Sequence, residues 1–259
     1  WMSEACASFV SIPKYWKTLV SPDKIVSLYD YSMAAKLCYT IVYIAFYMTE
    51  ENVTYNLTFT AGSAMLNEMH AVAEALRDCD GDWKRTKELT FRENLMEKNR
   101  LSTNQRVFSL MKQRIDALNE EERTLRVDGN MATRRQIVLL AICKAHPFIF
   151  DFIRENVREA FYSLHDRVSY ANFNEFFNEK KYIHPELEAI TELTIAKIRQ
   201  VVFRIMEQTE LIESTETGIL RRPYLTEQME QVIVKDHPRW LTIFLYSNNE
   251  INHLIAIHS

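Results

Sequence analysis

Glycine and proline are scarce in this chain, whose 259 residues include only 4 glycines and 6 prolines. A sheet-rich fold needs many tight turns, and glycine supplies most of the positive-φ positions in them. Hydrophobic residues make up 47% of the chain and charged residues 25%, which is enough apolar material for a packed core. This composition, rich in good helix formers, therefore predicts an all-α fold of helices joined by short loops.

The cysteines and the most apolar stretch bear on where the protein works. Four cysteines stand far apart in the sequence, which fits neither a disulfide framework nor a Cys-x-x-Cys metal site. The most apolar stretch, Met33–Met48, contains Lys36 and is shorter than the roughly 20 residues of a membrane-spanning helix. We therefore expect a core helix at this position and a cytoplasmic protein with no membrane segment.

Apolar spacing predicts a series of helices in the first half of the chain. The motif Ser21-Pro22 is a helix start that leads into the apolar stretch. Between residues 65 and 76, apolar side chains recur at intervals of three and four, and this pattern predicts a helix that closes before Gly81. Asp82 is placed to cap the next helix, and Ser102 or Thr103 to cap a third.

The best candidate for a domain boundary is the turn signal Asp128-Gly129-Asn130, which ends a polar stretch. It predicts two packed helical-bundle subdomains, residues 1–128 and residues 129–259. Beyond it, His146-Pro147 should separate two apolar helices, because the residue before proline is disfavoured in helical geometry. Residues 194–211 form an amphipathic helix pattern, and residues 211–222 carry the one β-hairpin signal.

Sequence motifs of catalysis are absent from this chain. It has no Walker A loop, GxGxxG, HExxH or nucleophile elbow, and its seven histidines never pair at helical spacing. We therefore expect no enzymatic activity, no cofactor and no metal site.

Basic residues are concentrated in one segment. Residues 82–114 carry nine basic side chains against four acidic ones, a net charge of +5, although the whole chain has −4. The other residues must therefore sum to −9, so charge is polarised along the sequence. Arg100 falls in a loop, and Arg106 and Arg114 lie about two turns apart on the next helix, so the three could line a groove that suits a phosphate backbone.

Two further basic sets follow. One lies near the proposed boundary, and the other places two cations on the helix 194–211 and two after the hairpin, an order typical of a recognition helix followed by a wing. Four glutamates between residues 207 and 216 would repel phosphate there. The candidate nucleic-acid contacts are Arg85, Lys98, Arg100, Arg106, Lys112, Arg114, Arg134, Arg135, Lys197, Arg204, Arg221 and Arg222. The alternative for each is a solvated side chain that pairs with a nearby glutamate.

Several separated blocks of sequence resemble one family. They occur in the same order over residues 55 to about 246: Tyr55–Leu66, Asp82-Trp83-Lys84, Asn94–Thr103, Ile183–Leu187, Lys197–Val202 and Pro238–Leu241. Together they look like the BrxA family of BREX phage-defence systems.

This resemblance implies an all-helical, NusB-like protein with no assigned enzymatic activity, encoded beside other BREX proteins. It agrees with a non-catalytic component that binds DNA or RNA through a basic groove. The alternative is a scaffold subunit that joins other BREX proteins without touching nucleic acid. The resemblance supplies no functional residues, so the candidate contacts rest on charge alone, and a homodimer is left open.

Overall fold

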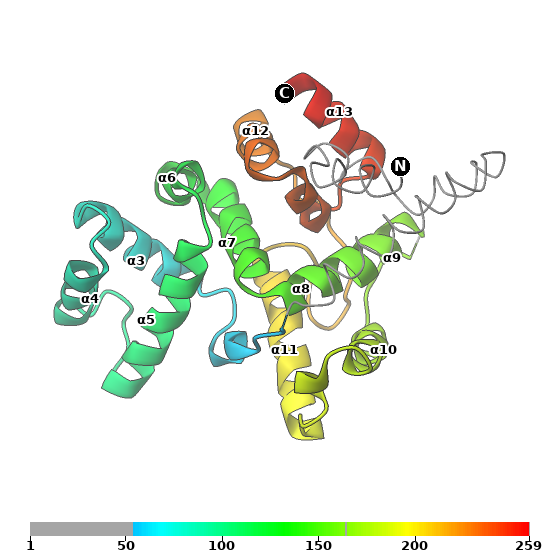
Figure 1. Ribbon diagram of the computed structural model, residues 1–259, viewed down its shortest axis with the longest axis horizontal. Coiled ribbons are helices and arrows are strands. Elements are labelled where there is room, and N and C mark those ends of the chain that lie inside the picture. Colours follow the sequence, from blue (N-terminus) through cyan, green and yellow to red (C-terminus); the bar gives the residue numbers. More distant parts are fainter. Residues whose placement is uncertain (1–53, 164, 259) are drawn as a thin grey trace, which may run out of the picture. The chain divides into compact units, whose positions relative to one another are not determined.

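The computed structural model describes residues 54–163 and 165–258, and most of these lie in helices, with the rest in loops and turns (Figure 1). The α-helices in this part of the chain are α3 (Leu66–Asp78), α4 (Trp83–Arg92), α5 (Leu101–Asp116), α6 (Glu120–Asp128), α7 (Met131–Ala145), α8 (Pro147–Phe152), α9 (Arg158–Tyr162), α10 (Tyr170–Lys181), α11 (Glu192–Gln208), α12 (Glu227–Asp236) and α13 (Asn248–His258). Short helical turns connect them: η5 (Thr58–Ala61), η6 (Ile153–Val157), η7 (Pro185–Leu187) and η8 (Pro238–Phe244). The predicted all-α class is confirmed.

Short-range sequence signals determine where α3 ends and where α4 begins. The chain leaves α3 through Gly81, which has a φ of 80° and donates its N–H to the Leu76 carbonyl at 2.9 Å. Asp82 then caps α4 as predicted, because its carboxylate accepts from the backbone N–H groups of Lys84 and Arg85. Trp83 and Phe91 of α4 pack edge-on against Phe108 of α5, with ring centroids 6.0 and 5.5 Å apart. Helices α3, α4 and α5 thus form one packed group.

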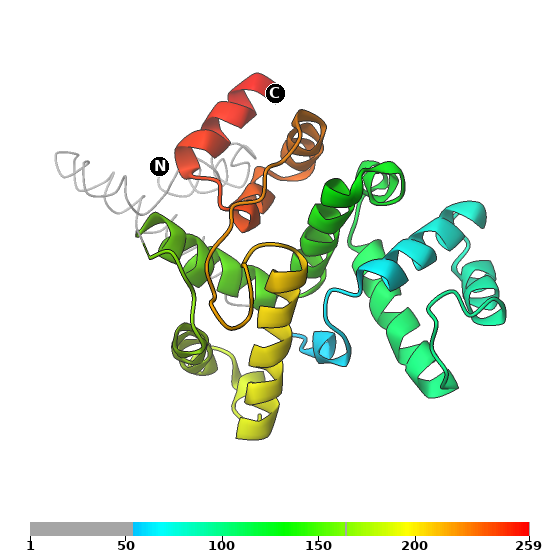
Figure 2. The same cartoon turned by 180° about the vertical axis from the view of Figure 1, so that it is seen from behind.

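Helix α7 is the centre of the core. Residues 136–143 are all buried, so the helix is apolar around its whole circumference and needs neighbours on every side. It packs against α3, α5, α6, α8 and α11, and lies between them in both ribbon views (Figures 1 and 2).

The chain turns by 111° at His146-Pro147, where α7 ends and α8 begins. This is the predicted break, with Pro147 at the first helical position. A single π turn, η6, then joins α8 to α9, so residues 147–162 continue as one helix.

The predicted β-hairpin is reduced to isolated pairing. Ile212 pairs with Leu220 and Arg167 with Ile219, both antiparallel, and no longer strand forms within the described residues. Gly218, with a φ of 60°, passes so close to Val168 that a Cβ atom would lie 2.0 Å from the Val168 carbonyl oxygen. Only glycine fits there.

A buried ion pair ties α6, α7 and α12 together. The Lys144 ammonium of α7 lies 2.7 Å from both carboxylate oxygens of Glu122 and 2.8 Å from Asp236. The Glu122 side chain is fully buried, and this burial raises its pKa in spite of the hydrogen bonds from Lys144.

Part of the predicted domain organisation stays a prediction. Thr54–Ser259 form one compact unit in which α6 and α7 pack together, and the proposed division at residue 128 stays a prediction. The NusB likeness also stays an expectation. The predicted start at Ser21-Pro22 and the apolar helix 33–48 lie outside the described residues.

The Lys144→Met substitution should lower the free energy of unfolding by about 3 kcal/mol, because it leaves the Glu122 carboxylate buried without its partner. The matched control is Lys235→Met, which removes an exposed pair with Glu121 and should change stability by less than about 1 kcal/mol. Urea unfolding at pH 7 measures both, and equal effects of the two substitutions would contradict the structural role of Lys144.

A second prediction concerns pH. His146 is fully buried, and burial, reinforced by the charge of Arg114, lowers its pKa to about 3. The unfolded chain, with an ordinary pKa of about 6.5, then binds more protons than the folded chain below neutrality. The contribution of neutral His146 to the free energy of unfolding is therefore complete above about pH 6.5. It decreases as the pH drops, by about 2 kcal/mol between pH 7.5 and pH 5.

His146→Leu should remove this part of the pH dependence, which urea unfolding at both pH values would show. The matched control is His253→Leu at an exposed position, and it should keep the parent's pH dependence. A His146→Leu variant with the parent's slope would show that another group causes the effect.

Candidate nucleic-acid interface

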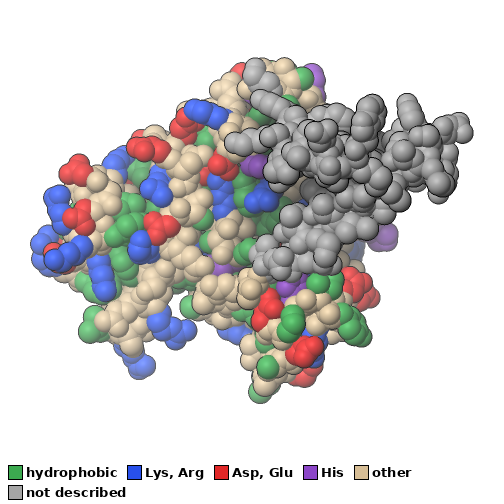
Figure 3. Space-filling view, viewed as in Figure 1, with side chains coloured by type: hydrophobic (Ala, Val, Ile, Leu, Met, Phe, Trp, Pro, Cys, Tyr) green, Lys and Arg blue, Asp and Glu red, His purple; other side chains and the backbone are tan. Residues whose placement is uncertain are grey.

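The basic segment 82–114 folds into α4, the following loop and α5, and cationic side chains gather over these elements at the left of the space-filling view (Figure 3). Lys84, Lys87, Arg100 and Arg106 are exposed there, and none has a carboxylate within ion-pair distance among the described residues. Their charge is therefore available to an outside anion. We call these four residues the α4–α5 cationic surface.

Other cations of the segment already have partners. The Arg85 guanidinium lies 3.7 Å from Asp80, and the Lys112 ammonium 2.6 Å from Asp116. Both pairs are exposed and therefore weak, so phosphate can compete for these cations. Lys98 is held more firmly, because its ammonium lies 2.7 Å from Glu68 and both side chains are mostly buried.

The prediction that Arg114 contacts phosphate is wrong. Its side chain is completely buried, and its guanidinium donates to the carbonyls of Ala64 at 2.9 Å and Gly62 at 3.4 Å. Burial lowers its pKa to about 9, although the nearby Glu68 opposes this shift, so the group stays charged at neutral pH. Arg114 therefore fixes the segment before α3 rather than binding a ligand.

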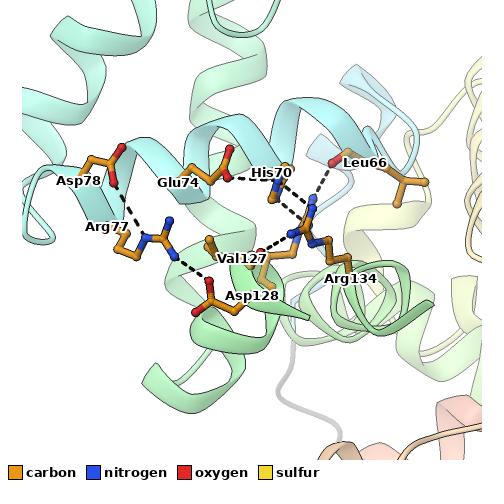
Figure 4. Close-up of polar contacts among 9 residues, drawn as sticks. Leu66, His70, Glu74, Arg77, Asp78, Val127, Asp128 and Arg134 are labelled. Carbon is orange, nitrogen blue, oxygen red and sulfur yellow. Dashed lines mark hydrogen bonds and ion pairs between the residues drawn. The ribbon is translucent and has the colours of Figure 1, made fainter. Parts of the chain in front are cut away.

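The residues of the second basic set, Arg134, Arg135 and Lys144, make contacts inside the fold. Arg134 donates to the Val127 carbonyl at 2.6 Å and lies 3.0 Å from Nε2 of His70 (Figure 4). Burial, together with the charge of Arg126, lowers the pKa of His70 and favours its neutral form. Arg135 is paired with Glu210, and Lys144 is the buried partner of Glu122. This set offers little free charge to a polyanion.

The third set is divided between free and paired cations. On α11, Arg204 is exposed without an ion pair among the described residues, and Lys197 is exposed and donates to Gln200 at 3.3 Å. Beyond the isolated pairing, the Arg221 guanidinium lies 2.6 Å from Glu213, and that of Arg222 lies 2.7 Å from Glu250. Arg221 and Arg222, which follow the predicted hairpin, are thus each paired with a carboxylate, unlike the cations of the α4–α5 cationic surface.

Two residues of the α4–α5 cationic surface, Lys84 and Lys87, are missing from the contacts that the sequence predicted. The sequence holds a signal for them, since Thr86 and Thr90 are the buried positions of α4 and are spaced by one turn. A lysine on either side of Thr86 therefore faces outward. Long-range pairing, such as Arg135 with Glu210, has no comparable signal in local spacing.

Sites of two other classes are absent from the described residues. No group of three His, Cys, Asp or Glu side chains is placed there to hold a metal ion. Within the same residues, no single helix combines the length and apolar composition needed to cross a bilayer.

Comparison with known proteins gives consistent matches. A family model described as BrxA matches residues 53–237. The BREX protein BrxA of Escherichia coli O9:H4 (strain HS) is 23% identical over 172 residues, which cover 66% of this chain and 80% of that protein. The BREX protein BrxA of Paramagnetospirillum magneticum is 22% identical over 191 residues, which cover 70% of this chain and 94% of that protein.

A solved structure has the same fold. An uncharacterized protein from Magnetospirillum magneticum superposes with a TM-score of 0.66 at 18% sequence identity. The match covers 74% of this chain and 98% of the other, so it includes nearly the whole of that protein.

The Arg114→Met substitution should lower the free energy of unfolding by about 2 kcal/mol, because a buried carbonyl and a partly buried one lose their donor. Arg106→Met on the same helix is the matched control, and its exposed position predicts a change within about 0.5 kcal/mol. Thermal or urea unfolding distinguishes them. An Arg114→Met variant with the parent's free energy of unfolding would mean that the carbonyl contacts of Arg114 do not stabilise the fold.

Proposed function

We propose a function from the premise that the chain belongs to the BrxA family. It is accordingly a component of a BREX phage-defence system, with other BREX proteins as partners. Within that system we propose a cytoplasmic protein that binds the phosphate backbone of DNA or RNA and catalyses no reaction.

The observation that supports this proposal is the α4–α5 cationic surface. Four exposed cations without carboxylate partners lie on α4, on α5 and at the end of the loop between them, and two weakly paired ones, Arg85 and Lys112, adjoin them. Exposed charges interact over about 10 Å at 0.1 M salt, so a local surface of this kind attracts phosphate despite the net charge of −4. Contacts to phosphate carry no sequence information, so binding should be sequence-tolerant.

Partly exposed aromatic rings add to this surface. The Lys112 ammonium lies 4.3 Å from the centre of the Trp83 ring, and the Lys87 ammonium lies 5.6 Å from that of Phe91. Both rings are anchored on Phe108 in the core and support the lysines near the surface. The lysine stems are therefore ordered before a ligand arrives, which reduces the entropy cost of binding.

The Arg100→Gln/Arg106→Gln double variant should weaken duplex DNA binding at low salt. For each arginine that no longer neutralises a phosphate, the slope of log affinity against log salt should become shallower by about 0.9, because fewer counterions are released. Fluorescence anisotropy over a salt series measures the slope for labelled DNA and, in parallel, for RNA.

The matched control is Arg167→Gln/Arg221→Gln, which makes the same change of net charge at two exposed arginines paired with Asp166 and Glu213. It should keep the parent's slope. Equal effects of the two double variants would assign binding to overall charge or to the third basic set. If the parent protein binds neither DNA nor RNA, the proposal is contradicted and the scaffold alternative is favoured.

A further inference from the structure

A group of exposed apolar side chains lies where α10 ends and α11 begins. Tyr182 is 91% exposed, Ile183 52% and Leu193 86%, whereas most large apolar residues of the described chain are buried. Asn178 of α10 and Glu192 of α11 line one groove of about 210 Å³, so the two helix ends lie side by side. The apolar side chains therefore belong to one region of the surface.

Carboxylates surround this region. Residues 170–193 carry five glutamates against two lysines, a net charge of −3. Glu179, Glu188 and Glu192 are exposed and have no ion pair among the described residues. Lys180 is paired with Glu155 at 2.8 Å. The other nearby cations are Lys181, Lys197 one turn after Leu193, and Arg199 in the groove. We call Tyr182, Ile183, Leu193 and these three glutamates the acidic–apolar surface.

The acidic–apolar surface lies apart from the α4–α5 cationic surface. In both ribbon views α10 and the start of α11 lie well apart from α4 and α5, with η5 between the lower parts of α11 and α5 (Figures 1 and 2). The space-filling view shows red and green side chains together at the lower end of α10 and α11 (Figure 3). Unpaired carboxylates repel phosphate, so nucleic acid is the wrong ligand for this end.

We infer that the acidic–apolar surface docks a partner protein that presents an apolar side chain flanked by lysines or arginines. The exposed tyrosine is of the type that interface centres favour, the leucine adds apolar contact area, and the three glutamates supply a complementary polar rim. The groove beside Glu192 is lined mainly by polar side chains, among them Asn178 and Arg199, so it offers hydrogen-bonding groups next to the apolar contact made by Tyr182 and Leu193. The docking does not depend on nucleic-acid binding, because it uses none of the same residues.

The test uses the full chain, affinity-tagged and expressed together with the other proteins of its BREX system, with nuclease added during purification. Tyr182→Asp/Leu193→Asp should reduce recovery of one BREX protein at least tenfold and leave the salt slope of DNA binding unchanged. Leu101→Asp is the matched control, because Leu101 is 65% exposed next to Arg100 at the other surface. That variant should keep the partner protein. Circular dichroism checks that all variants are folded, as their exposed positions predict.

A zero-length carbodiimide crosslink locates the contact. The expected product joins Glu188 or Glu192 to a lysine of the recovered BREX protein, and raised salt before crosslinking should reduce its yield. Unchanged recovery in the double aspartate variant, or crosslinks that map elsewhere on the chain, would overturn the inference. Crosslinks from Glu188 or Glu192 to a second copy of this chain would overturn it too and assign the surface to self-association.

Discussion

The enclosure of α7 is the constraint on which the rest of the structure depends. Eight consecutive residues, 136–143, are buried, so no side of this helix can face water. Removing its apolar surface from water contributes roughly 25 cal/mol per Å², and this requires neighbours all round. Helices α3 and α5 meet one side and α8 and α11 another, while α6 and η8 complete the enclosure. The outer helices α4 and α10 are then free to carry polar surfaces.

Buried charges fix how the outer elements sit on this core. Lys144 faces Glu122 and Asp236, so α6 and α12 are tied to the end of α7. Arg114 holds the carbonyls of residues 62 and 64 while Gln208 of α11 accepts from the Ala64 N–H at 2.9 Å. These groups would be costly to bury alone, so each one accepts few arrangements of its neighbours.

The surface that remains is polarised in space. Cations without partners gather on α4 and α5, and carboxylates without partners gather with apolar side chains at the end of α10. Separate surfaces of opposite charge can hold a polyanion and a protein at the same time, because neither ligand has to displace the other. This arrangement suits a member of a multiprotein defence system, and under the proposals above nucleic-acid binding and scaffolding are compatible roles for one chain.

The sequence by itself determined the helical class, the end of α3, the start of α4 and the break at His146-Pro147. These features depend on residues within about four positions of each other, such as the Asp82 cap, so local spacing contains them. The predicted cap at Ser102 or Thr103 is wrong, because α5 begins at Leu101 after Arg100. Only the tertiary structure decided which cations stay free. Arg114 and Arg106 share one helix, yet one is buried against carbonyls fifty residues away and the other is exposed. Burial of a charge depends on acceptors that distant segments supply, and no local pattern records them.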